Sequence, residues 1–482
     1  MKKQSLVAVA VAAVCFAGVA QATNWLQLEG TEPNGIAAPI KVFGFIQPTY
    51  QDTGGSAVNG LVGPAATPFN GAVPRFNEVA PQHTASTGFG ILRARLGVRG
   101  TVLPVNNKVD YFLMAEFGNN GYTETGSGGS TPRITDASVT FNEIPGARVR
   151  VGIFKTPGPE EDLQGIPDFD YVNFTNVSGQ LILNQFVTGP AYAGGTTGTP
   201  GIGAGGYAVT SAPINAARDT GVQVFDWFNN GPWQFAYAGM IANGSTLYAN
   251  NTANTPSYYG LLQEAYIFNH SKGPHQAGIS GWVWGHVGHE GLDVSNGTGL
   301  GFTQQDYTYK RYGLGAQFRS GFMKPGALRV TGELMRGTGW IITPEPFANT
   351  ATGAAGAGTC GTASATSNGL CTEALYPSAD NAAVGGYVEA GFFVSTHWDL
   401  EARYDQYNRL TNNPGLERIF KTTTLGIQYY ISPKARVTLN YAFNRIDVPH
   451  LAAISPAGAQ TNALAVTSAK DNAIALQTTL IF

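Results

Sequence analysis

Charged residues are scarce in this sequence: they make up 12% of its 482 residues, and the formal net charge is −3. A soluble protein of this size normally has about a quarter charged residues. The slight acidic excess also argues against a general nucleic-acid-binding protein, which needs a basic surface. The composition therefore points away from an ordinary soluble domain and from a nucleic-acid partner.

Long apolar runs are also lacking, apart from one at the start of the chain, from Leu6 to Val19. This run is shorter than the ~20 residues a helix needs to span a bilayer. It follows Lys2 and Lys3 and precedes the small-x-small sequence Ala20-Gln21-Ala22, which is the pattern of a secretory signal peptide. We expect residues 1–22 to be removed. The balance of the mature chain, 23–482, then moves from −3 to −5.

Only three cysteines and seven histidines occur. Cys15 lies in the expected leader, whereas Cys360 and Cys371 flank a Gly/Ala/Ser/Thr-rich stretch, where export favours a disulfide. The group His286, His289 and Glu290 lacks the spacing of a helical metalloprotease motif. No CxxCH haem motif and no convincing Ser/His catalytic set is present. We therefore expect no cofactor, no metal and no enzymatic activity.

Glycine and aromatic residues are abundant instead, with 63 glycines and 11% aromatics. The stretch 88–101 shows how the apolar residues are distributed. Leu92, Ala94, Leu96 and Val98 alternate with Arg93, Arg95 and Arg99, as in a β-strand with one apolar and one basic face. Dispersed apolar residues at every second position are typical of a transmembrane β-barrel.

The alternation recurs along the chain. It predicts sixteen strands, at about 40–51, 88–101, 108–118, 133–143, 147–155, 219–229, 232–242, 258–268, 275–287, 306–319, 326–337, 381–395, 397–408, 417–431, 435–446 and 470–482. Short turns alternate with long loops between them, the longest being 156–218 and 338–380. This is the connectivity of an up-and-down barrel with periplasmic turns and external loops. A terminal aromatic, Phe482, closes the last strand.

The polar faces predict a wet interior. In the segment 397–408, one face carries Asp399, Glu401, Arg403 and Asp405. Burying such a row without water would cost many kcal/mol. We therefore predict an all-β, antiparallel, closed barrel of about sixteen strands around an aqueous lumen, forming a single domain over 23–482.

The long loop 156–218 follows the fifth strand, and we expect it to fold into the lumen as a constriction. Its first half carries five acidic residues: Glu160, Glu161, Asp162, Asp168 and Asp170. Parity places basic residues on the lumen wall, namely Arg93, Arg95, Arg99, Arg148, Arg150, Arg311, Arg329, Arg403 and Arg436. A ring of arginines favours anions. Alternatively, these arginines pair with Asp110, Glu116 and Asp136 on neighbouring strands.

Four segments, RARLGVRGT (93–101), YFLMAEFGNN (111–120), ITDASVTFN (134–142) and RVRVGIFKTPGPEE (148–161), resemble the phosphate-selective porin O and P family. The resemblance implies a sixteen-strand, homotrimeric outer-membrane channel with an inward third loop. It also implies a place in the lumen arginine ladder for Arg93, Arg95 and Arg99, and Lys155 at the start of the constriction. Unlike phosphate-specific members, this chain is acidic from Lys155 until Arg218.

We therefore expect a porin in the bacterial outer membrane for passive diffusion of small hydrophilic solutes. An anion preference, for phosphate or other oxyanions and carboxylates, is a further expectation. Its surroundings would be outer-membrane lipid and lipopolysaccharide. One alternative is a barrel that sheathes a periplasmic or electron-transfer partner. The other, ranked last, is an outer-membrane hydrolase.

Overall fold

The structure is a computed structural model that describes residues 39–52, 56–63, 70–71, 87–102, 106–118, 132–183, 217–244, 255–270, 275–295, 302–344, 373–376, 378–455, 457–468 and 472–482. The expected leader, 1–22, lies outside these ranges, as do Cys360 and Cys371. The cleavage site and the disulfide therefore remain predictions.

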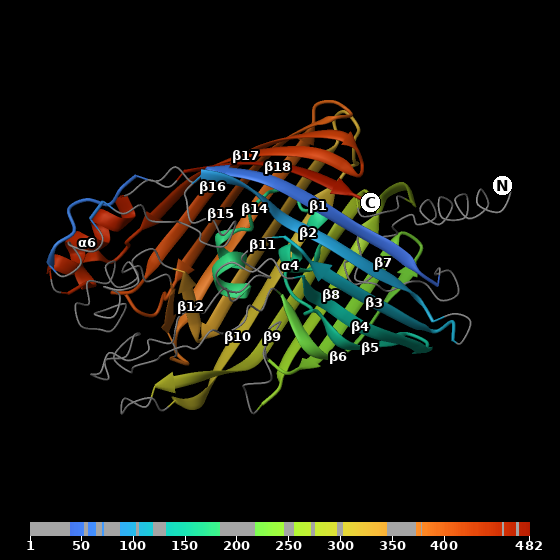
Figure 1. Ribbon diagram of the computed structural model, residues 1–482, viewed down its shortest axis with the longest axis horizontal. Helices are drawn as coiled ribbons and strands as arrows, with labels where there is room; N and C mark the ends of the chain where they lie inside the picture. Colours follow the sequence, from blue (N-terminus) through green and yellow to red (C-terminus); the bar gives the residue numbers. More distant parts are fainter. Residues whose placement is uncertain are drawn as a thin grey trace.

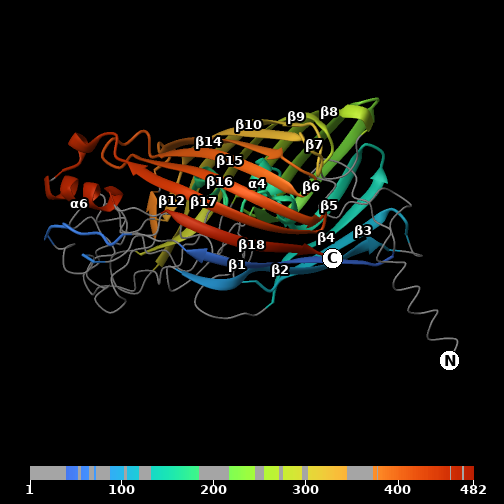
Figure 2. The same cartoon turned by 90° about the horizontal axis from the view of Figure 1, so that it is seen from above.

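Within the described ranges, the chain forms a closed antiparallel barrel of sixteen strands (Figures 1 and 2). In chain order these are β1 (Lys41–Asp52), β2 (Thr87–Thr101), β3 (Val109–Glu116), β4 (Arg133–Ile144), β5 (Ala147–Lys155), β6 (Arg218–Asn230), β7 (Trp233–Ala242), β8 (Ser257–Ile267), β9 (Gly278–Ser295), β10 (Phe302–Arg319), β11 (Leu328–Gly339), β14 (Ala382–Phe393), β15 (Trp398–Arg409), β16 (Arg418–Ser432), β17 (Ala435–Asp447) and β18 (Ala473–Ile481). Each pairs with its neighbours in sequence order, and β1 pairs with β18. The predicted all-β, antiparallel, closed barrel of about sixteen strands is confirmed.

The chain ends close the barrel. Phe482, just beyond β18, exchanges two backbone hydrogen bonds with Gly44 of β1: its N–H donates to the Gly44 carbonyl at 3.0 Å, and its carbonyl accepts from the Gly44 N–H at 3.2 Å. A sheet edge with unpaired N–H and C=O groups cannot face lipid, since each unsatisfied group there costs several kcal/mol. Pairing of the first and last strands removes that edge.

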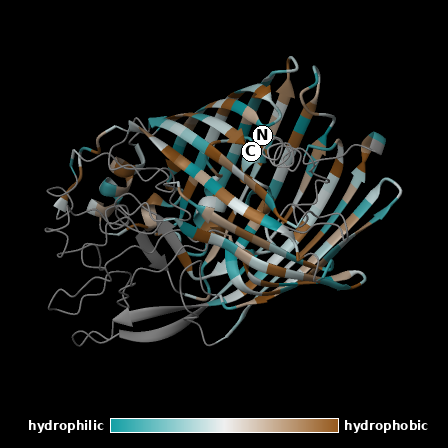
Figure 3. Cartoon of the chain, turned by 45° about the vertical axis from the view of Figure 1, so that its right-hand side comes forward, coloured by the Kyte–Doolittle hydropathy of each residue, from teal (hydrophilic) through white to brown (hydrophobic). Residues whose placement is uncertain are grey.

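Hydrophobic and hydrophilic residues alternate along the strands (Figure 3), and the exposed large apolar side chains lie on the outer face. On β15, Trp398, Leu400 and Tyr404 are 43–45% exposed on the outside, whereas Asp399 and Asp405 are buried inside. The alternation places most charged side chains of the strands on the inner face, because successive side chains point to opposite faces. Among the described residues, no helix is long and apolar enough to cross a bilayer.

Tight turns join the strands at the end expected to be periplasmic. Gly146 (φ 79°) follows β4 and Gly231 (φ 60°) follows β6, which is a backbone conformation that glycine adopts without a Cβ clash. Several features of the opposite end were not predicted. The strands β9 and β10 continue as far as Ser295 and Phe302. A separate two-stranded sheet pairs β12 (Ile341–Pro344) with β13 (Glu373–Tyr376), and a helix, α6, spans Ala457–Ser468.

One residue of the stretch 88–101 faces the opposite way from its prediction. Leu92 was expected on the apolar outer face, but it is 1% exposed and packs against Val172 and Ala475. The register explains this, because Gln47 pairs with Arg93 while Pro48 pairs with Ile91, which leaves Leu92 as an extra residue. Such a β-bulge shifts the alternation by one, so Ile91 (45% exposed) takes the outward position.

Candidate functional site

A segment of the long connection between β5 and β6, residues 156–183, lies against the inward-facing side chains of the wall. It contains three short helical turns: α4 (Glu160–Leu163), η2 (Ile166–Asp168) and η3 (Ser178–Ile182). Figure 1 shows α4 among the barrel strands. Residues 184–216, the remainder of the loop, lie outside the described ranges. The contacts below define this segment as the candidate site.

The start of the segment is fixed where β5 ends. Lys155 Nζ donates to the carbonyl oxygens of Gln164 (2.9 Å) and Leu163 (3.4 Å), so the predicted constriction lysine holds the end of α4. The Thr156 N–H donates to the Ala217 carbonyl just before β6. These bonds turn the chain back across the interior immediately after the strand.

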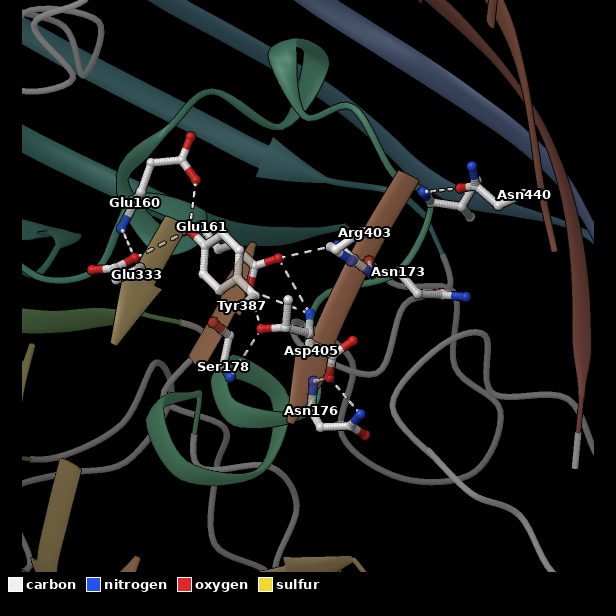
Figure 4. A network of polar contacts seen from close by, with 12 residues as sticks. Glu160, Glu161, Asn173, Asn176, Ser178, Glu333, Tyr387, Arg403, Asp405 and Asn440 are labelled. Carbon is white, nitrogen blue, oxygen red and sulfur yellow. Dashed lines mark hydrogen bonds and ion pairs between the residues drawn. The ribbon is translucent and has the colours of Figure 1, made fainter. Parts of the chain in front are cut away.

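Glu333 of β11 anchors α4 and was not predicted. Its carboxylate accepts hydrogen bonds from Trp282 Nε1 (2.8 Å) and Trp284 Nε1 (2.7 Å) of β9, and from the Glu160 backbone N–H (3.1 Å). The Tyr387 hydroxyl lies 3.1 Å from Glu333 and 3.0 Å from the Glu160 carboxylate. Figure 4 shows Glu160, Glu333 and Tyr387 together. Strand parity, which puts Glu333 on the inner face, was the available signal.

A second anchor joins α4 to β15. The Arg403 guanidinium donates to Glu161 Oε1 at 3.3 Å, and both side chains are at most 3% exposed. Glu161 also accepts from the Thr175 hydroxyl at 2.5 Å, while Arg403 lies over the Tyr171 ring at 4.2 Å. Burial raises the pKa of Glu161, and Arg403 opposes that rise. Figure 4 shows Glu161 and Arg403 with the neighbouring Asp405, which accepts from Asn176.

A third anchor lies between η2 and η3. Arg329 of β11 donates through Nε to Asp170 at 2.8 Å, and also contacts Asp399 (3.2 Å) and Glu401 (2.8 Å) of β15. On β17, Arg436 donates to the Phe169 carbonyl and Asn440 accepts from the Val172 N–H at 2.9 Å. The segment thus binds wall strands on several sides of the interior.

Asp168 and His275 form a fourth contact. Asp168 Oδ1 lies 3.5 Å from Nε2 of His275, and His275 belongs to the connection between β8 and β9. Burial raises the pKa of Asp168 to about 6, against the opposing charges of Arg436 and Arg319. Burial and the same arginines hold the pKa of His275 well below its ordinary value. At neutral pH we therefore expect an ionised Asp168 beside a neutral imidazole.

Four basic side chains converge on a small cavity beneath the segment. The cavity has a volume of about 20 Å³, enough for one water molecule, and is lined by Arg93, Arg95, Lys155, Glu161, Asp162, Ile166, Phe174, Leu183, Ala217 and Arg218. Asp162 is 3% exposed, and neither of its carboxylate oxygens has a hydrogen-bond partner among the described residues. Burial, with Glu161 nearby, raises the pKa of Asp162 well above its ordinary value.

The structure places the predicted basic residues on the inner face, where several are covered. Arg93 and Arg150 are 1% exposed and Arg95 is 5% exposed. Arg95 pairs with Glu116 at 2.7 Å, which is the alternative weighed from the sequence. Asp110 accepts hydrogen bonds from Thr101 and Asn142. Arg99, Arg148 and Arg329 also lie on this face, Arg148 pairing with Asp226 at 3.2 Å.

Arg218 was not singled out as a wall residue, although it begins β6. It donates to Asp136 of β4 at 3.0 Å. Asp136 was predicted as a partner of the wall arginines, and Arg218 was not among those arginines. Its position at the junction of loop and strand gave no periodicity from which to assign its face. Arg218 lines the same small cavity as Arg93, Arg95 and Lys155.

The fold and the inward segment define a class: a transmembrane barrel with charged and polar residues on its inner face and a loop segment packed against them, that is, a diffusion channel. A sequence model of the phosphate-selective porin O and P family matches residues 69–170 and 282–463, more than half of the chain. This protein belongs to the phosphate-selective porin O and P family. It is an outer-membrane porin for passive diffusion of small hydrophilic solutes.

Solved structures with related folds were also found. The chain is similar to the outer membrane channel DcaP of Acinetobacter baumannii, with 12% identity, a TM-score of 0.48, and coverage of 94% of this chain and 100% of that one. It is also similar to an anion-selective porin from Comamonas acidovorans, with 13% identity, a TM-score of 0.48, and coverage of 92% and 100%. A sequence search of curated proteins finds no match.

Proposed function

We propose that this porin prefers small anions, such as phosphate, other oxyanions and carboxylates, and that the preference is mild. The observation that carries the proposal is the convergence of Arg93, Arg95, Lys155 and Arg218 on one cavity beside the inward segment, where two acids, Glu161 and Asp162, face them. Positive charge at a narrow point lowers the energy of an anion there, and the pairs of Arg95 with Glu116 and of Arg218 with Asp136 keep the preference mild. Low local dielectric strengthens the effect.

The loop acids limit this preference. Glu161 and Asp170 are paired with Arg403 and Arg329 on the strands β15 and β11. Each pair places opposite charges within hydrogen-bonding distance and leaves little net field. Anions are therefore attracted mainly on the side of β2, β5 and β6. No covalent step is involved: selection arises from the width of the passage and its charge.

Planar-bilayer recording tests the proposal. In a salt gradient, we expect a reversal potential of the sign for anion selectivity. Arg95→Ala should shift it toward cations, because Glu116 then loses its paired charge. The control is Lys108→Ala, which removes an equal charge from an exposed pair with Glu143 in a turn. An unshifted potential in Arg95→Ala, or an equal shift in both variants, would contradict the proposed role.

We further propose a homotrimer with a mature chain that begins near Thr23. The family resemblance supports the first and the leader pattern the second. Mass spectrometry of the native complex and of the denatured chain tests both. The inward segment disfavours the alternative of a sheath around a partner protein, since it crosses the space that the partner would occupy.

A further inference from the structure

A row of basic side chains follows the outer face of three adjacent strands. These are His289 on β9, Lys310 on β10 and Arg336 on β11, and both Lys310 and Arg336 are exposed. The register sets the row on a diagonal: His289 pairs with Thr308, two residues from Lys310, and Lys310 pairs with Thr338, two residues from Arg336. Diagonal neighbours of this kind lie about 7–8 Å apart.

The row marks the external edge of the apolar band. The last apolar outward residues are Val287 (46% exposed) on β9, Tyr312 (47%) on β10 and Leu334 (65%) on β11. On each strand the next outward residue toward the long-loop end is the basic one. Three adjacent strands therefore change from apolar to basic at the same boundary, which is the level of lipid headgroups.

Of the residues that the structure describes, none forms an ion pair with Lys310 or Arg336. Elsewhere on the outer rim the opposite holds: Lys421 and Arg445 both pair with Asp447, at 2.8 and 2.5 Å. Thr308 and Thr338 stand beside Lys310 in the register and supply hydroxyl donors. The patch is thus rich in donors suited to a phosphate.

Apolar side chains continue below this row on β9 and β10, among them Val283 (50% exposed), Ile279 (50%) and Leu314 (58%). Leu314 is four residues from Lys310, roughly 13 Å along β10. A basic rim above an apolar band has the polarity of one amphiphile, with its headgroup at the rim.

We propose that this face binds a phosphate-bearing lipid of the external leaflet. Its phosphate lies between Lys310 and Arg336, and its acyl chains lie along the apolar outer face of β9 and β10 below them. Charge complementarity at the rim and the apolar lining below it select an anionic lipid over a free anion or a neutral lipid. The site is on the outside of the barrel and does not depend on the ion preference of the lumen.

Native mass spectrometry of the detergent-purified trimer or monomer tests this with defined probes: bisphosphorylated lipid A, the same lipid without phosphates, and inorganic phosphate. The variant Lys310→Gln/Arg336→Gln is compared with Lys421→Gln/Arg445→Gln, which removes two outward cations that have a partner. Each basic residue near an anionic lipid surface contributes ~1 kcal/mol, so we expect about 30-fold weaker lipid A binding in the first variant. The control should bind as the wild type does.

The outcomes separate the possible occupants. Equal binding of phosphorylated and dephosphorylated lipid would overturn the proposal, as would equal loss in both double variants. Binding of inorganic phosphate with the same dependence on Lys310 and Arg336 would assign the patch to free anions instead. A change of oligomeric state in Lys310→Gln/Arg336→Gln would show that a second copy of the chain covers it. Conductance serves as the folding check, since neither residue faces the lumen.

Discussion

Arg329 on β11 holds Asp170 of the inward segment at 2.8 Å between Nε and Oδ2, and the same guanidinium contacts two further carboxylates, those of Asp399 and Glu401. One buried cation therefore serves three acids, only one of which belongs to the loop. Loss of the Arg329 side chain would leave the carboxylates of Asp170, Asp399 and Glu401 close together without the positive charge that now lies between them.

We expect Arg329→Ala to release this part of the segment from the wall. Removing one partner of a buried ion pair costs about 3–5 kcal/mol, and repulsion among the remaining acids acts in the same direction. Single-channel records should show larger or noisier conductance, and the unfolding temperature should fall. Lys421→Ala is the control, because its pair with Asp447 is partly exposed and is worth at most about 1 kcal/mol. Quiet, wild-type currents in Arg329→Ala would refute the anchoring role.

The Glu333 carboxylate fixes α4 through neutral donors. In Glu333→Ala, Trp282 Nε1, Trp284 Nε1 and the Glu160 N–H lose their acceptor. An unsatisfied buried donor costs about 1–3 kcal/mol, so we expect a loss of several kcal/mol and a changed near-UV circular dichroism signal from the two tryptophans. Glu333→Gln keeps one acceptor oxygen, so its unfolding free energy should lie between those of the wild type and Glu333→Ala. Equal losses of unfolding free energy in Glu333→Ala and Glu333→Gln would contradict the anchoring of α4 by Glu333.

Gly385 of β14 allows η3 to approach the wall. A Cβ at this position would meet Val177 Cβ at 2.8 Å and the Gln406 carbonyl oxygen at 2.8 Å. Gly385→Val should therefore displace the segment next to η3 and alter conductance. Gly239→Val on β7 is the matched control, since a Cβ there has nothing within 4 Å. Equal conductance changes in the two variants would mean that β-strand propensity, not contact with the loop, is responsible.

Asp168 predicts a pH dependence of defined sign. Its folded-state pKa of about 6 exceeds the ordinary value of 3.8, so the folded protein retains the proton longer than the unfolded chain. The associated stability is fully present below about pH 4 and is lost as the pH rises through 6, by up to about 3 kcal/mol. His275 stays neutral in this window because its pKa is lowered.

The variant Asp168→Asn measures this contribution. Its advantage in unfolding free energy over the wild type should be larger at pH 7.5 than at pH 4, and denaturant unfolding at the two pH values checks it. Above pH 6 the wild-type loop also carries one more negative charge, so the reversal potential should move toward anions on acidification. If the difference in unfolding free energy between Asp168→Asn and the wild type does not change with pH, the raised pKa of Asp168 is contradicted.

The sequence by itself determined the barrel. A residue's face follows from its parity in a strand, which is a local property, so sixteen strands, their order and the inner position of Arg93, Arg95, Arg150 and Arg329 could be predicted. The inward acids of 156–183 were also recognisable as a set. Parity failed at Leu92, because a bulge depends on how β1 and β2 pair and not on either strand alone.

Only the tertiary structure decided the partners. That Glu161 meets Arg403, that Asp170 meets Arg329 and that Glu333 accepts from two tryptophans depends on where a loop crosses a closed ring of strands. No local pattern encodes such contacts, since ring closure brings together residues hundreds of positions apart. The outer basic row has the same origin: His289, Lys310 and Arg336 are unremarkable in sequence and become neighbours only through the register of β9, β10 and β11.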